Sequence, residues 1–288
     1  MLISSSLGGP LDPWTVKPII ENKKRVFYPK HTKSHIDCLV GGKEVPNFQD
    51  RAQEYIDSII PLAGVSFTGL NTVKLLGKRW QYSPLQLVST GEPSPLPGGK
   101  HKGETVPQII NKSKEKYLAI IYGSNNRYFY DGTVSVENAM NMFFTELNIL
   151  LENSTFEAVF IATIFPRSAD IDQNNNVISN VKKFNEMFLS HRTRTIEKYF
   201  IYGKNDKGER RAIRWIPVDM TDTLIYSEMK ELKYYCCKNY KKPSNRQDLT
   251  HINAVYLEIY LKKLSNAVLK YNKSVAKFQK TRKRKFEP

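Results

Sequence analysis

The sequence predicts an α/β protein in which a mainly parallel central sheet lies between two layers of helices. Apolar runs typical of strands that are buried on both faces occur at 117–122 and 158–165. Each run is followed by an amphipathic helical pattern, at 136–151 and 177–189. Because strand and helix alternate in this way through most of the chain, we expect a three-layer α/β/α arrangement.

Weaker patterns extend the alternation in both directions along the chain. Helices are expected at 51–60, 71–76 and 105–111, and strands at 63–69, 199–202 and 212–218. The crowding of Pro, Gly and Ser at 89–104 predicts a loop. A long final helix is indicated by apolar residues at helical spacing, namely Ile252, Val255, Ile259, Leu264 and Val268.

These patterns divide the chain into an irregular N-terminal arm at 1–50, one domain at 51–270 and a basic tail at 271–288. No apolar run approaches the roughly 20 residues that span a bilayer, so we expect no membrane span. The start of the chain is a poor signal peptide, which favours an intracellular protein. Three cysteines without metal-ligand spacing give neither a disulfide framework nor a metal site, and no cofactor is expected.

Charge is the strongest compositional feature. The formal net charge of +16 predicts an affinity for nucleic acid or another polyanion. The charge is densest in the tail, at Lys280, Arg282, Lys283, Arg284 and Lys285. Such a run is typical of a nuclear-import signal or of a nucleic-acid-binding tail, and a solvated, disordered terminus is the alternative.

Polar and glycine residues follow the ends of two predicted elements. Gly123-Ser124-Asn125-Asn126 follows the strand at 117–122, where an Asn side chain can donate to a developing oxyanion. Gly98-Gly99 precedes the helix at 105–111 and permits close backbone approach to a ligand. Ordinary turn chemistry and a flexible loop are the alternatives.

A carboxylate and an imidazole lie close together in the chain just before the last helix. Asp248 and His251 are three residues apart and can approach each other across a helix start. A carboxylate beside an imidazole fixes its tautomer and raises its basicity, as a general base requires. The alternative is that Asp248 caps the helix and His251 lies in its first turn.

In this order the motifs resemble those of the SGNH (GDSL-type) hydrolase superfamily. That family reads strand-Gly-Asp-Ser, a glycine, strand-Gly-x-Asn-Asp and finally Asp-x-x-His before the last helix. The matching stretches here are Gly69-Leu70-Asn71, Gly98-Gly99, Gly123–Asn126 and Asp248–His251. The segment Ile164–Arg167 followed by Asn185 also looks like its relatives. The resemblance covers roughly residues 60–270 and implies the flavodoxin-like fold of the family.

The resemblance also implies roles for these residues. Gly98 or Gly99 and Asn125 would be oxyanion donors, His251 the base, and Asp248 its orienting partner. The nucleophile position falls on Asn71, whose amide nitrogen cannot attack an acyl group. Two alternatives keep a nucleophile: rescue by the neighbouring Thr72, or a true first block elsewhere, for example around Ser83 or Ser89.

Three hypotheses for function follow. The first is a catalytically inactive SGNH hydrolase-like protein reused as a structural or binding module. It is similar to SGNH-like domains of viral or mobile-element proteins, which implies nucleic-acid association, or self-assembly into a particle or virion. The second is an active serine- or threonine-dependent esterase or acetylhydrolase with a displaced nucleophile. The third is a purely electrostatic nucleic-acid binder, located in the nucleus.

Overall fold

The structure is a computed structural model of the 288-residue chain. It describes the backbone at 1–5, 16–21, 24–29, 64–67, 78–83, 86–93, 95, 103–124, 126, 134–165, 175–221, 235–237, 247–252 and 254–286. Side chains are described at 1, 3, 95, 103–124, 126, 134–165, 180–221 and 259–279.

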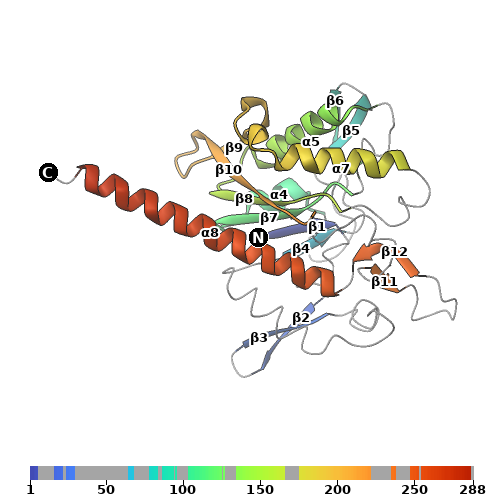
Figure 1. Ribbon diagram of the computed structural model, residues 1–288, viewed down its shortest axis with the longest axis horizontal. Helices are drawn as coiled ribbons and strands as arrows, with labels where there is room; N and C mark the ends of the chain where they lie inside the picture. The colour runs from blue at the N-terminus through green and yellow to red at the C-terminus, as the bar shows by residue number, and fades with distance from the viewer. Residues whose placement is uncertain are drawn as a thin grey trace.

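The central sheet has six strands in the order β4-β1-β7-β8-β10-β9 (Figure 1). Their bounds are β1 Leu2–Ser5, β4 Gly64–Phe67, β7 Tyr117–Ile121, β8 Ala158–Ala162, β9 Ile201–Lys204 and β10 Arg210–Val218. All pairings from β4 to β10 are parallel, and β9 runs antiparallel to β10. Counted along the chain, the parallel strands lie in the order 2-1-3-4-5, one of the two common doubly wound orders. The prediction of an α/β protein with a mainly parallel sheet is therefore confirmed.

Three two-stranded antiparallel sheets accompany the central sheet. They pair β2 (Val16–Glu21) with β3 (Lys24–Pro29), β5 (Lys78–Ser83) with β6 (Gln86–Pro93), and β11 (Tyr235–Cys237) with β12 (Gln247–Ile252). Part of the loop expected at 89–104 is thus strand β6.

Strand β1 differs from its expected place in an irregular arm. Ile3 pairs with Val65 of β4 on one side and with Ile120 of β7 on the other. The Met1 carbonyl accepts a hydrogen bond of 2.7 Å from the Ala119 N–H, and Ile3 is fully buried. A four-residue strand has too short a pattern to be read locally. It is an inner strand of the sheet because it pairs on both sides with strands that are distant in the sequence.

The helices agree closely with their sequence patterns. They are α4 (Val106–Asn111), α5 (Val136–Leu151), α7 (Asn175–Leu189) and α8 (Ala254–Phe286), with short 3₁₀ turns η4 (His191–Arg194) and η5 (Glu197–Tyr199). Helix α8 continues without a break through the tail, and its C-terminal half extends well beyond the sheet (Figure 1). The helices expected at 51–60 and 71–76 lie outside the described residues.

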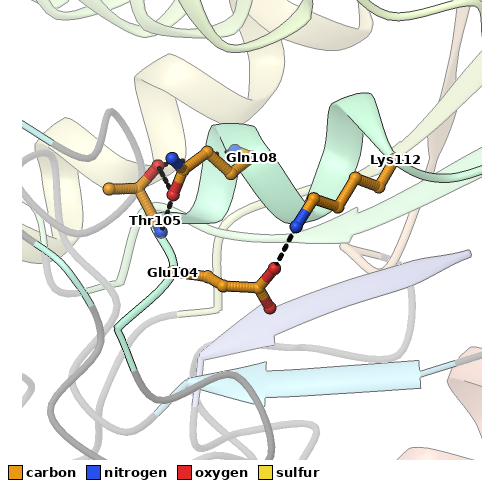
Figure 2. A network of polar contacts seen from close by, with 4 residues as sticks. All are labelled: Glu104, Thr105, Gln108 and Lys112. Atoms are coloured by element: carbon orange, nitrogen blue, oxygen red, sulfur yellow. Dashed lines mark hydrogen bonds and ion pairs between the residues drawn. The ribbon is translucent and has the colours of Figure 1, made fainter.

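A capping box fixes the start of α4 (Figure 2). The Gln108 N–H donates to Thr105 Oγ1 at 3.4 Å, and the Thr105 N–H donates to Gln108 Oε1 at 2.7 Å. Lys112 Nζ and Glu104 Oε1 join the two ends of the helix at 2.5 Å. The two capping-box bonds satisfy N–H groups that the first turn leaves without helical partners.

Strand β8 is buried along its whole length because helices cover both of its faces. Val159 and Ile161 belong to one apolar cluster with Phe143 of α5. On the other face the Phe160 ring lies 6.0 Å from the Tyr271 ring of α8, at an interplanar angle of 89°. Burying each such large side chain stabilises the fold by about 1.5–3 kcal/mol, so α5 and α8 both hold the sheet.

Candidate active site

β1 and β7 are neighbours whose carboxyl ends lie at the same edge of the sheet. Ser4 pairs with Ile121, the last residue of β7, so Ser5 comes level with the residue that follows β7. In a sheet of order 2-1-3-4-5 the winding changes direction between the first and third strands. Ligand sites form outside the carboxyl ends at that point. We therefore expect a ligand site beyond the ends of β1 and β7.

The segment after β7 turns sharply and buries polar side chains. Gly123 has a φ of 113°, a conformation that glycine adopts without strain. The Asn126 N–H donates to the Gly123 carbonyl at 3.0 Å and closes the turn. Ser124 and Asn126 are only 4% and 1% exposed. The turn predicted after this strand is thus confirmed, and it holds polar groups away from bulk water.

A buried carboxylate on α5 holds this turn. Glu146 has no solvent exposure, and its Oε2 accepts hydrogen bonds from Tyr122 Oη at 2.8 Å and Asn126 Nδ2 at 3.1 Å. Asn126 Nδ2 also donates to Tyr122 Oη at 2.7 Å, which closes a triangle of polar groups. The Tyr122 ring stacks on Phe143 of α5, with centroids 5.9 Å apart.

The triangle has an energetic consequence for the site. A buried carboxylate is costly unless hydrogen-bond donors surround it, and removal of a donor leaves part of that cost uncompensated. Glu146 therefore constrains the positions of Tyr122 and Asn126. These residues flank the stretch in which an oxyanion donor is predicted, so the network acts as a support for the turn.

Sequence reasoning overlooked this support. It assigned Asn126 only to the turn after the strand and gave no role to Glu146. The available signal was the position of Glu146 within the apolar stripe of its helix, three residues after Phe143 and four before Leu150. A carboxylate at such a position predicts a buried polar contact.

The end of the neighbouring strand β8 is held in a similar way. Asn185 of α7 is 1% exposed; its Nδ2 donates to the Ile164 carbonyl at 3.0 Å, and its Oδ1 accepts from the Ile164 N–H at 2.9 Å. Ile164 and Asn185 both belong to the segments between the motif blocks that resemble SGNH hydrolases. The amide satisfies backbone groups just beyond the strand and ties α7 to this edge of the sheet.

Several predicted site residues lie outside the described part of the chain: Asn71, Thr72, Gly98, Gly99 and Asn125. Strand β4, which precedes Asn71, pairs with β1 and is separated from β7 by it. Ser83 and Ser89, the other positions considered for the first block, lie in the β5–β6 pair and not in the central sheet. The roles assigned to these residues stay predictions.

Asp248 and His251 lie in strand β12, which ends two residues before α8 begins at Ala254. Their place just before the last helix is confirmed. The local conformation is a strand paired with β11, so Asp248 does not cap α8 and His251 is not in its first turn. Only the backbone of this pair is described, and its proposed contact stays a prediction.

The basic tail is helical. Lys280, Arg282, Lys283, Arg284 and Lys285 all fall within α8, although their side chains lie outside the described set. The helix contains ten Lys and Arg residues and one acidic residue, Glu258. Phe278 within the tail is 69% exposed and Leu269 just before it is 44% exposed, so neither apolar side chain is part of the core.

Among the residues that the structure describes, no helix is both long and apolar enough to cross a membrane, and no group of His, Cys, Asp or Glu has the arrangement of a metal site. Comparison of the chain with protein-family models, curated proteins and solved structures finds no match.

Proposed function

We propose that the protein is a serine hydrolase with the three-layer, flavodoxin-like domain of the SGNH superfamily, and that serines at the end of β1 supply its nucleophile. The observation that best supports this is the strand order, in which β1 lies between β4 and β7. The family pattern has its serine directly after a strand. Ser5 ends β1 and Ser6 follows it.

Distance favours β1 over β4 as the strand that carries the nucleophile. Neighbouring strands lie about 4.8 Å apart, so residues after β1 and β7 are close, whereas the end of β4 is about 10 Å from β7. A nucleophile and an oxyanion donor must both lie near 3 Å from the reacting group. Asn71 comes after the outer strand β4 in the sequence, whereas Ser5 is the last residue of the inner strand β1 and Ser6 is the next residue in the sequence.

The reaction that fits this arrangement is hydrolysis of an ester by acyl transfer. The serine oxygen bonds to the acyl carbon while His251 takes its proton, and the alcohol leaves with that proton. Water then gives a proton to His251 and attacks the acyl-serine, which releases the carboxylic acid and returns the proton to serine. Asp248 would orient His251, and Asn125 with Gly98 or Gly99 would donate to the oxyanion.

The alternative function is a domain without acyl-transfer chemistry that serves as a binding or structural module. It requires Asn71 to stand at the nucleophile position. The basic helix α8 supports a role of this kind, in association with nucleic acid or in a viral or mobile-element particle. A nuclear location belongs to the same proposal.

Ester hydrolysis separates the two functions. We expect the intact chain to cleave p-nitrophenyl acetate and to lose this activity on treatment with a fluorophosphonate. One of the two substitutions Ser5→Ala and Ser6→Ala should lower kcat by at least about 10³-fold, because only one of these serines is the nucleophile. His251→Ala should lower kcat to the same extent. Ser274→Ala, at an exposed serine of α8, is the matched control and should leave kcat unchanged.

Two results would contradict the hydrolase. Hydrolysis that survives both serine substitutions would exclude the end of β1 as the source of the nucleophile. A folded wild-type chain that neither hydrolyses the ester nor reacts with the fluorophosphonate would support the inactive binding module.

A further inference from the structure

A cavity of about 720 Å³ lies between β10, the η4 turn and α8. Strand β9 pairs with β10 only from Arg210 to Ile213, so β9 does not cover the edge of β10 beyond Ile213. Pro217 lies in this later stretch, as expected where no partner strand needs its missing N–H. The volume is within the usual range of about 300–1,000 Å³ for a small-molecule site.

The cavity lies far from the candidate active site. Tyr271, which lines it, packs against Tyr117 with ring centroids 5.7 Å apart, and Tyr117 is the first residue of β7. The candidate active site follows the last residue of the same strand. A strand of five residues spans about 17 Å, so the two sites lie at opposite ends of β7.

Cations line the cavity without acidic residues among them. Arg194, Arg214 and Lys270 all contribute and are exposed, and His191 lies beside them. The ion pairs seen among the described residues join Lys112, Lys116 and Lys198 to glutamates and involve none of the three. Among the described residues, the cavity therefore has positive charge without an acidic partner and favours an anionic ligand.

Aromatic rings with fixed positions form the walls. The Trp215 indole stacks on Phe188 at 5.0 Å and 21°, and its Nε1 donates to the Tyr199 carbonyl at 3.1 Å. Trp215 is only 6% exposed and belongs to the apolar core, whereas Tyr271 is partly exposed and is held edge-on by both Tyr117 and Phe160. Rigid aromatic rings beside guanidinium groups are what unpaired bases and their phosphates bind.

A row of basic residues leads away from the cavity along α8. Lys270, Lys273, Lys277, Lys280 and Arg284 follow one another at spacings of three or four residues, so these positions share one face of the helix. The row is about 21 Å long at 1.5 Å per residue. No acidic residue occurs in the helix after Glu258.

We propose that the cavity and this lysine row form one binding track for single-stranded nucleic acid. One unpaired base enters the cavity and packs against the Tyr271 ring, with its phosphate at Arg194 and Arg214. The phosphates that follow lie along the row from Lys270 toward Arg284. A duplex binds only the row, because its paired bases cannot enter the cavity.

Fluorescence anisotropy with a labelled oligonucleotide of about 12 nucleotides tests the track, with the same sequence as a duplex for comparison. The cavity variant Arg194→Gln/Arg214→Gln should weaken single-strand binding at least about tenfold and duplex binding less than about threefold. The row variant Lys273→Gln/Lys277→Gln/Lys280→Gln should weaken both and reduce the salt slope for the single strand by about 2.

A matched control removes three exposed lysines elsewhere. Lys182→Gln/Lys183→Gln/Lys207→Gln removes the same charge from α7 and the β9–β10 turn and should change affinity less than about twofold. Equal losses in the control and row variants would overturn the track, as would a cavity variant that weakens duplex and single strand alike. AMP that binds as tightly as the oligonucleotide would instead assign the cavity to a free nucleotide and also overturn the track.

Discussion

Glu146 is the one charged side chain among the described residues that is fully buried. Its partners Tyr122 and Asn126 come from the turn after β7, whereas Glu146 itself comes from the middle of α5. Each of the three side chains therefore shares a hydrogen bond with each of the other two. At the scale of single residues, this triangle connects the stability of the fold to the geometry of the proposed site.

Removal of one donor from the triangle should be costly. We expect Tyr122→Phe to lower the free energy of unfolding by about 1–3 kcal/mol, because the Glu146 carboxylate loses a hydrogen bond in a place that water does not reach. Urea unfolding measures the change. Glu186→Gln, at an exposed position of α7, should change stability by less than about 0.5 kcal/mol. Equal effects of the two substitutions would contradict a structural role for the triangle.

In a chain that carries a free amino group on Met1, this group should make stability depend on pH. It donates to the Tyr117 carbonyl at 2.6 Å, and burial lowers its pKa from 8.0 to about 6, against the opposing effect of Glu115. The unfolded chain therefore binds more protons between pH 6 and 8, so stability rises with pH across this window. We expect a gain of about 2 kcal/mol from this group.

Urea unfolding at pH 6 and pH 8 measures this gain in a chain that carries a free amino group on Met1. The same chain acetylated at Met1 is the control, because its amide nitrogen has no charge to bury. Its change in stability between the two pH values should be smaller by about 2 kcal/mol. Identical pH profiles for the two chains would show that the amino group is not buried.

At the scale of elements, sequence patterns located helices and inner strands well but not β1. The helix expected at 136–151 is α5, and the buried runs became β7 and β8, because apolar periodicity records local burial. β1 has only four residues, two of them serines, and becomes a strand through partners more than 60 residues away. Local sequence patterns do not record pairings between distant strands. The choice of the strand that precedes the first motif block depends on the pairing of β1.

The tail of α8 is a second element whose structure local sequence patterns did not predict. Its sequence is rich in Lys and Arg, which favour helix, yet the charge run predicted only a basic tail outside the domain, with a disordered terminus as the alternative. The helix continues because its N-terminal half is anchored to the sheet. Tyr260, Leu261, Leu264 and Val268 are buried there, and helix propagation needs no further tertiary contact.

The anchored half should dominate the contribution of α8 to stability. Leu264 has no solvent exposure, and we expect Leu264→Ala to lower the free energy of unfolding by about 2–5 kcal/mol through the cavity it leaves. Leu269→Ala on the same helix is the matched control, since Leu269 is 44% exposed, and should cost less than about 1 kcal/mol. Thermal or urea unfolding compares them; equal losses would mean that α8 does not pack on the sheet through this stripe.

At the scale of the whole molecule, the sheet separates two kinds of surface. The segment after β7 carries buried hydroxyl and amide groups that contact the buried carboxylate of Glu146, and such groups suit chemistry on a small polar group. The opposite end carries the cationic cavity and the start of the basic half of α8, which suit a long polyanion. Much of the net charge of +16 belongs to α8, so charge and the proposed catalytic chemistry occupy different parts of the molecule.

Identification of the residue that reacts with a fluorophosphonate tests the hydrolase most directly. The labelled protein is digested, and mass spectrometry locates the phosphonyl adduct. We predict one adduct per chain, on the amino-terminal peptide at Ser5 or Ser6, and none in the His251→Ala variant. An adduct on a serine or threonine of any other strand, or a folded chain that takes up no label, would contradict the proposal that β1 carries the nucleophile.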